Sequence, residues 1–446
     1  MFKQTKEIHD LKKTFARYVS LNVIGMLGLS CYILADTVFI ANGVGGNGLT
    51  ALNLVLPIFS LLNALGLMLG MGGATRYTIL RSNQKETEAN KSFTQTILIT
   101  GMLGIFITVI GLFFAYDIAK LLGADKTIAP MSGNYLKTIL LFSSAFLFNN
   151  VFICFVRNDG NPRLSMTAML VGSFGNILLD YVFIYPLKLG MFGAAFATGL
   201  SPLISLSVLS LHFLKKKNNL KLVRTPFMFH SIFHTLTLGL PSFITELSSG
   251  IIILCFNYQI LNLSGNTGVA AYGIIANIVL TVVAMFTGIS QGIQPLLSSN
   301  YGAGKIDYVK SIYRWAIYLA FAFGVFFYTI CYLYPEPIVA IFNTENDALL
   351  SELAIQGMKI YFAAFFFMGT NIVTTSFFTS IDQPKQSFVI SITRGIVAVL
   401  PLIFLLPIFF KMTGVWLTIP LVEAITLCIS TKSIIKYWKT HPTIGN

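Results

Sequence analysis

Charged residues are scarce in this sequence of 446 residues. Asp, Glu, Lys and Arg make up only 11% of the chain, whereas 55% is hydrophobic and the mean hydropathy is +0.75. Soluble domains carry about 25% charged residues, so a chain this poor in charge cannot cover a water-facing surface. The composition therefore excludes an ordinary soluble protein and predicts an integral membrane protein.

Several signatures of chemistry are also missing. The five cysteines lie singly within apolar runs, without the paired spacing of a metal site or a disulfide framework. No GxxxxGK[ST] motif occurs, which excludes a P-loop ATPase, and no nucleophile constellation or histidine cluster indicates an enzyme. The net charge of +13 comes from short basic clusters between apolar runs and not from a basic stripe, which argues against nucleic-acid binding. We expect no enzyme activity, no cofactor and no nucleic-acid partner.

Apolar runs of about twenty residues, the length that crosses a bilayer, recur along the chain. They predict an all-α membrane protein with twelve transmembrane helices. The predicted spans are 16–41, 50–75, 93–115, 134–157, 163–186, 192–214, 232–262, 268–299, 311–334, 357–380, 385–409 and 413–437.

Lysines and arginines favour alternate loops. If the N-terminus is cytoplasmic, 23 of the 30 basic residues lie on inside segments, six lie outside and Arg394 lies within a span. Cytoplasmic loops carry such an excess of positive charge. We therefore predict a multi-pass protein of the plasma membrane with both termini in the cytoplasm.

The two halves of the chain resemble each other at an offset of about 221 residues. Asn-Pro at 161–162 matches Gln-Pro at 383–384, for example. Six spans per half make this a parallel repeat, which is typical of alternating-access transporters. The predicted organisation is an N-lobe at 1–214, a cytoplasmic linker at 215–231 and a C-lobe at 232–446.

Few acidic residues fall within the predicted spans; the others lie in loops or tails. Asp36 and Asp180 each lie about six residues from the outer end of a span, roughly 9 Å below the outer boundary. Asn176 lies one turn deeper than Asp180 on the same helix face, and Thr198 reaches a similar depth. These oxygen ligands suit Na⁺, and the two carboxylates can equally share a proton. The alternative is a structural network between packed helices.

Three further charged residues lie deep in spans. Glu246, near the midplane, can bind an organic cation, serve as a second proton site or be a structural hydrogen-bonded glutamate. We expect structural roles for Arg394 and Glu423, with charge pairing in the second lobe. Polar residues of spans 2 and 8 either line a central cleft or satisfy hydrogen bonds between helices. They are Asn53, Asn277, Gln291 and Gln294.

The motifs resemble those of the MATE (multidrug and toxic compound extrusion) transporters, in particular the MepA-like branch, over nearly the whole chain. They are RNDGNPRLSM at 157–166, GNILLDYVFI at 175–184, GAAFATG at 193–199, GLPSFITELSSG at 239–250 and GISQGIQPLLSSNYGAGK at 288–305. The resemblance implies two six-helix lobes in a V shape and a cation antiporter.

The resemblance also implies particular site residues. The cation site of the family's N-lobe corresponds to Asp36, Asn176, Asp180 and Thr198, and its span 7 glutamate corresponds to Glu246. Span 10 here has Asn371 but no carboxylate where some members carry one, which argues against a complete Na⁺ site in the C-lobe.

The sequence thus predicts a multidrug exporter that exchanges small, cationic and aromatic compounds for H⁺ or Na⁺ by alternating access, as a monomer in the lipid bilayer. The alternative is a lipid-linked oligosaccharide flippase of the related superfamily. Such a flippase tends to need a basic central cavity, and only Arg394 lies deep in a span.

Overall fold

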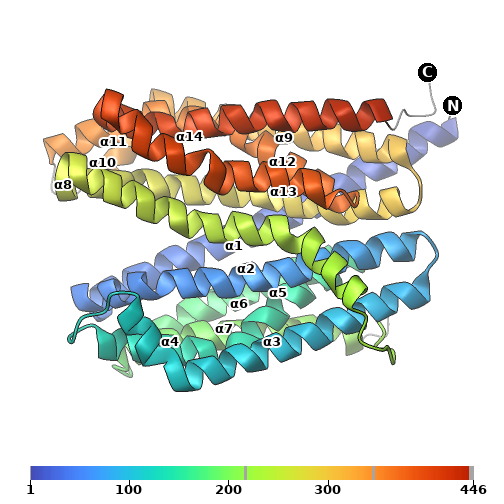
Figure 1. Cartoon of the computed structure of the whole chain (residues 1–446), viewed down its shortest axis with the longest axis horizontal. Helices are drawn as coiled ribbons and strands as arrows, with labels where there is room; N and C mark the ends of the chain where they lie inside the picture. Colours follow the sequence, from blue (N-terminus) through green and yellow to red (C-terminus); the bar gives the residue numbers. More distant parts are fainter. Residues whose placement is uncertain (1, 215–217, 344–346, 441–446) are drawn as a thin grey trace. The chain divides into compact units, whose positions relative to one another are not determined.

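The computed structural model describes residues 2–214, 218–343 and 347–440, and every regular element among them is helical (Figure 1). Lys215, Lys216 and Lys217 of the predicted linker lie outside the described residues. The elements are α1 (Phe2–Gly43), α2 (Gly46–Ser82), α3 (Glu86–Leu121), α4 (Ala129–Leu141), α5 (Ser143–Asn158), α6 (Pro162–Ile184), α7 (Gly190–Leu214), α8 (Phe229–Gly302), α9 (Ile306–Leu333), α10 (Pro335–Phe342), α11 (Ala348–Tyr361), η1 (Phe362–Ala364), α12 (Phe365–Ser380), α13 (Pro384–Ile392), the π-helical η2 (Thr393–Val397) and α14 (Val399–Thr440).

The helices account for all twelve predicted spans. Within the described residues nine helical stretches are long and apolar enough to cross a membrane, and the pair α4 and α5, bent by 50°, makes a tenth. Two of these stretches are of double length, Phe229–Gly302 with 74 residues and Pro384–Thr440 with 57. Each contains a non-helical residue where two helices join, Gly265 (φ 61°) in the first and Lys411 (φ 48°) in the second. Division at these residues gives twelve spans, as predicted.

The outer faces of the helices are apolar. Leu121 is 86% exposed, Phe409 76% and Phe113 73%, and many other large hydrophobic side chains are exposed as well. Exposed apolar surface on this scale is stable only in contact with lipid. The chain is therefore a multi-pass membrane protein.

The chain forms two compact units whose limits differ from the predicted lobe boundaries. One unit is Ile24–Leu247, and the other combines Met1–Val23 with Ser248–Asn446. We call them the N-unit and the C-unit. Helices α1 and α8 therefore each belong partly to one unit and partly to the other.

Close helix packing explains why these two helices are divided. In the N-unit, a Cβ on Gly72 of α2 would lie 2.0 Å from the carbonyl oxygen of Thr235 in the first part of α8. In the C-unit, a Cβ on Gly292 of α8 would lie 2.8 Å from the Cα of Val19 in the first part of α1. Only glycine permits such close approach of two backbones. The first part of α1 thus packs within the C-unit, and its later part belongs to the N-unit. The first part of α8 packs within the N-unit, and its later part belongs to the C-unit.

Backbone geometry repeats along the chain at roughly the predicted offset. Asn161 and Gln383, each followed by a helix-starting proline, have nearly identical dihedral angles, φ −119° and ψ 62° against φ −118° and ψ 62°. Positive φ angles also recur in pairs. The pairs are Gly45 with Gly265, Gln84 with Gly304, Gly160 with Asp382 and Lys188 with Lys411. The same turns thus join equivalent helices in both halves, which supports the internal repeat.

Candidate functional site

Helix α6 sets the geometry of the N-unit site. Its first turn is fixed by Pro162 and by Asn161, whose side-chain oxygen accepts a hydrogen bond from the backbone N–H of Leu164 at 3.2 Å. Asn caps of this kind and proline at the first helical position define a helix start. From there an unbroken helix runs to Ile184 and places Asn176 and Asp180 on one buried face.

The structure brings the four predicted residues Asp36, Asn176, Asp180 and Thr198 together from three helices, α1, α6 and α7. The side-chain carboxyl groups of Asp36 and Asp180 lie within hydrogen-bonding range of each other. In the orientation that satisfies its polar atoms, the Asn176 amide donates to Asp180 Oδ2 at 3.0 Å and accepts from the Thr198 backbone N–H at 3.2 Å. All four residues are buried.

The two carboxyl groups retain unused acceptor capacity. Oδ1 of Asp36 and Oδ1 of Asp180 are both buried and have no hydrogen-bond partner among the described residues. Two carboxyl groups can hydrogen bond to each other only when one carries a proton. A buried oxygen without a donor is costly, and a bound cation satisfies it. The donor set of carboxylate, amide and hydroxyl oxygens fits a proton or a hard monovalent cation such as Na⁺.

Two tyrosines surround the carboxyl pair, and the sequence analysis did not include them. Tyr135 on α4 lies close to the side chain of Thr198 and within electrostatic range of both carboxyl groups. Tyr32 lies within electrostatic range of Asp36, Asp180 and Glu246. Its spacing of one helical turn before Asp36 is a signal that the sequence contained. Tyr135 had no such signal, because it comes from a separate helix.

Glu246 lies on α8 in the N-unit and is half-buried. It makes no hydrogen bond or ion pair with a described residue. Glu246 and both members of the carboxyl pair lie within electrostatic range of Tyr32. The role of Glu246 as a substrate-binding group, a second cation site or a structural glutamate stays a prediction.

The C-unit contains a different polar cluster. Nε of Arg394, in the π-helix η2, lies 2.6 Å from Oε1 of buried Glu423, which confirms the expected charge pairing. Asn371 Nδ2 donates to Glu423 Oε2 at 2.8 Å, and Ser430 Oγ donates to Asn371 Oδ1 at 3.0 Å. Each member therefore has partners, as a structural network requires.

The four residues proposed for a cleft have different environments. Gln294 is fully buried and donates to Ser298 Oγ at 3.3 Å, which favours the structural alternative for it. Gln291 and Asn277 are half-buried, and Asn53 is exposed. A role in lining a cleft stays a prediction for these three.

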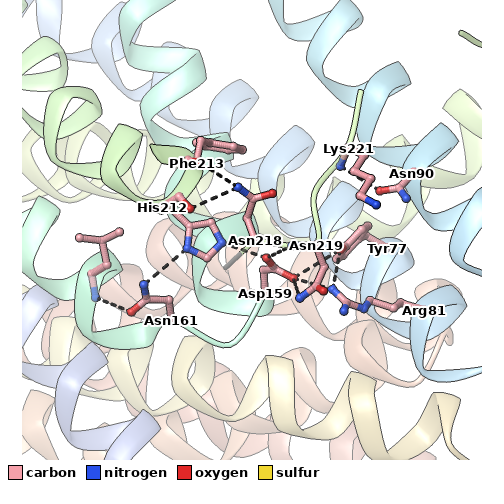
Figure 2. Close-up of polar contacts among 11 residues, drawn as sticks. Tyr77, Arg81, Asn90, Asp159, Asn161, His212, Phe213, Asn218, Asn219 and Lys221 are labelled. Carbon is pink, nitrogen blue, oxygen red and sulfur yellow. Dashed lines mark hydrogen bonds and ion pairs between the residues drawn. The ribbon is translucent and has the colours of Figure 1, made fainter. Parts of the chain in front are cut away.

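Another buried carboxyl group of the N-unit, that of Asp159, lies at the turn between α5 and α6, apart from the Asp36–Asp180 pair (Figure 2). Asp159 Oδ1 lies 2.6 Å from Arg81 Nη1, and Oδ2 lies 2.9 Å from His212 Nε2. The linker joins this network, because the backbone N–H of Asn219 donates to Asp159 Oδ2 at 2.8 Å. Burial raises the pKa of Asp159, but the hydrogen bonds from His212 and Asn219 and the charge of Arg81 outweigh it, so the pKa lies below its usual value.

The linker continues along α3 beyond this carboxyl group (Figure 2). The backbone N–H of Lys221 donates to Asn90 Oδ1, and that of Val223 donates to Thr94 Oγ1, both at 3.0 Å. The sequence analysis placed Asp159 in a loop, which the structure confirms, but did not predict that its carboxyl group is buried. Linker residues cover the carboxyl group, and no local pattern around it predicts that.

A family model named MatE matches residues 22–182 and 241–405, which is more than half of the chain. The Multidrug export protein MepA of Staphylococcus aureus (strain MSSA476) is 26% identical over 428 residues, which cover 93% of this chain and 91% of the relative. The protein of the same name from Staphylococcus haemolyticus (strain JCSC1435) is 28% identical over 420 residues, with the same coverage.

Solved structures share the fold. One is described as the outward-facing conformation of a multidrug resistance MATE family transporter of the MOP superfamily. It aligns with a TM-score of 0.89 over 97% of each chain, at 23% sequence identity. This likeness confirms the predicted twelve-helix, two-lobe fold class.

Proposed function

The chain belongs to the MatE family, and we propose that it exports small, drug-like, cationic and aromatic molecules in exchange for H⁺ or Na⁺ by alternating access. The names of its staphylococcal relatives support multidrug export. The observation that carries the coupling proposal is the pair of adjacent, buried carboxyl groups of Asp36 and Asp180 in the N-unit.

The carboxyl pair can couple cation binding to helix movement because its two members come from different helices. Without a cation or proton, two negative charges on α1 and α6 repel each other in a medium of low polarity. When a proton or Na⁺ binds, the repulsion is removed and the two helices can approach. Cation binding then favours one arrangement of α1 over another, which is the unequal binding that coupling requires.

The surrounding groups have distinct roles in this proposal. Asn176 holds Asp180 in place through its amide, and Thr198 supplies a hydroxyl to the site. Glu246 binds the organic substrate or a second cation near the same carboxyl groups. The flippase alternative gains no support, because Arg394 is already paired with Glu423 and is not available for a pyrophosphate group.

Three further features belong to the proposal. The basic residues favour a cytoplasmic location for both termini. The cation site lies within one unit of a single chain, so we propose transport by a monomer. Small organic molecules and the bilayer itself are then the only partners that the activity requires.

Ethidium transport in proteoliposomes tests the coupling proposal. The wild type, driven separately by a proton gradient and by a Na⁺ gradient, should transport ethidium with at least one of them. Asp36→Asn and Asp180→Asn should reduce gradient-driven transport to the level of empty liposomes. Asp117→Asn, which removes an exposed carboxylate from α3, should transport like the wild type.

Binding and unfolding measurements separate coupling from folding. Asp36→Asn keeps the side-chain shape and removes a buried charge, so its thermal unfolding temperature should not fall. It should also still bind ethidium. Normal gradient-driven transport by Asp36→Asn would remove the carboxyl pair from the mechanism.

A further inference from the structure

The C-unit contains a pocket that the proposed transport mechanism does not use. Its volume is about 350 Å³, and it is lined by residues of α9, α12 and α14, of which α12 packs against both others (Figure 1). Arg314 and Lys310 come from the first turns of α9, and Trp438 comes from the last turn of α14. The pocket therefore begins near one end of the spans and not at their middle.

The mouth of the pocket is positively charged. Neither Lys310 nor Arg314 forms an ion pair with a described residue, and the lining includes no acidic side chain. Lys310 Nζ instead lies 5.8 Å from the centre of the Trp438 ring. Two cations without a carboxylate at a membrane-facing pocket favour an anionic ligand and disfavour the cationic substrates proposed for transport.

The deeper part of the pocket is lined by apolar side chains and by hydroxyl groups that already have hydrogen-bond partners in the protein. Ile317 and Ile434 contribute apolar walls. The hydroxyls of Tyr313 and Thr374 are hydrogen bonded to each other at 3.0 Å, and Ser430 donates to Asn371. A ligand that fits this pocket has a charged end at Lys310 and Arg314 and an apolar end beside Ile317 and Ile434.

The membrane contains molecules that have one charged end and one apolar end. Tryptophan and basic side chains are typical of the level of the lipid headgroups, and basic pockets between transmembrane helices bind acidic headgroups. We propose that this pocket binds an anionic phospholipid, with its phosphate at Lys310 and Arg314 and the upper part of an acyl chain along Ile317 and Ile434. Under the predicted orientation the lipid comes from the cytoplasmic leaflet.

Native mass spectrometry of the purified full-length transporter tests this site. The probes are phosphatidylglycerol and phosphatidylcholine with identical acyl chains, each titrated separately. The wild type should bind one phosphatidylglycerol more tightly than any phosphatidylcholine. Lys310→Gln with Arg314→Gln should weaken phosphatidylglycerol binding roughly ten- to thirtyfold, because each cation near the membrane surface contributes about a factor of five.

A matched control removes the same charge from the same end of the protein. Lys432→Gln with Lys436→Gln changes two exposed lysines of α14 that do not line the pocket. This variant should bind phosphatidylglycerol like the wild type. Ile434→Trp, which fills the pocket without a change in charge, should weaken binding, and inorganic phosphate should not displace the lipid.

Two results would overturn the assignment. One is an equal loss of binding in both double glutamine variants, which would mean that only the total surface charge matters. The other is equal binding of phosphatidylcholine and phosphatidylglycerol by the wild type. Arg314→Gln alone, at an exposed position, provides the same comparison if the double variant does not fold.

Discussion

Replacement of Asp159 by asparagine should release the linker from the N-unit. In the wild type this fully buried carboxyl group accepts hydrogen bonds from the backbone and side chain of Asn219 and contacts Arg81 and His212 (Figure 2). Asparagine keeps one acceptor oxygen but removes the charge and directs an NH₂ group towards donors. The linker segment 218–226 should then open more often.

The size of the effect follows from the partners. Loss of one member of a buried ion pair costs about 3 to 5 kcal/mol, and the lower value applies because the Arg81 side chain is 30% exposed. A cost of about 3 kcal/mol increases the population of the open linker about a hundredfold. Amides of Asn219, Lys221 and Val223, which all donate to side chains in the closed form, should exchange faster by about that factor.

Hydrogen exchange followed by mass spectrometry of peptides from 218–228 measures this opening. Asp125→Asn is the matched control, because Asp125 also accepts backbone hydrogen bonds but only from Thr127 and Ile128 in its own loop. It should leave the linker peptides unchanged. Wild-type exchange rates in Asp159→Asn would refute the view that this carboxyl group holds the linker.

The pH dependence of the same protection follows from the lowered pKa of Asp159. The unfolded chain binds a proton at about pH 3.9, and the folded chain binds it at a lower pH. The stabilisation is therefore fully present above about pH 4 and is lost as the pH falls through the lowered value. After correction for intrinsic exchange, the difference in linker protection between wild type and Asp159→Asn should disappear in strong acid.

Two further predictions concern packing and charge pairing. Glu423→Gln leaves Arg394 without its buried partner, so it should lower stability by about 3 kcal/mol or more in thermal unfolding, whereas replacement of both residues by apolar ones of similar size should cost much less. Gly239→Ala places a Cβ 1.8 Å from the backbone oxygen of Met68 and should greatly reduce the yield of folded protein. The identical change at Gly250, which has open space on the same helix, should be neutral or slightly stabilising.

The sequence alone was sufficient to predict the spans and the contact of Asp36 with Asp180. Both predictions rest on fixed dimensions, the thickness of a bilayer and the rise of a helix per residue. A bilayer has a fixed thickness, so apolar runs of the right length identify spans without tertiary information. A helix rises by a constant amount per residue, so Asp36 and Asp180 could be placed at the same depth from their distances to span ends. Their contact in the structure needed only that the two helices be neighbours.

Other features depended on contacts between distant segments. The limits of the compact units follow from backbone contacts of Gly72 with Thr235 and of Gly292 with Val19, which no local composition indicates. Tyr135 reaches Thr198 from α4, whose rotation about its axis is set by packing. The burial of the loop residue Asp159 was not predictable because the linker that covers it lies about sixty residues later in the chain.

The two halves of the repeat use buried charge in opposite ways, and from this difference we infer that the proposed coupling lies in the N-unit. In the C-unit, Glu423 is matched by Arg394 and by Asn371, so its charge is already neutralised and an incoming cation gains little there. In the N-unit, Asp36 and Asp180 share one buried site without a basic partner among the described residues, and each has an oxygen without a donor. A cation therefore changes the energy of the N-unit far more than that of the C-unit. A cation can shift the equilibrium between two conformations only if it binds one of them more tightly than the other. Its binding should therefore move the helices that carry Asp36 and Asp180.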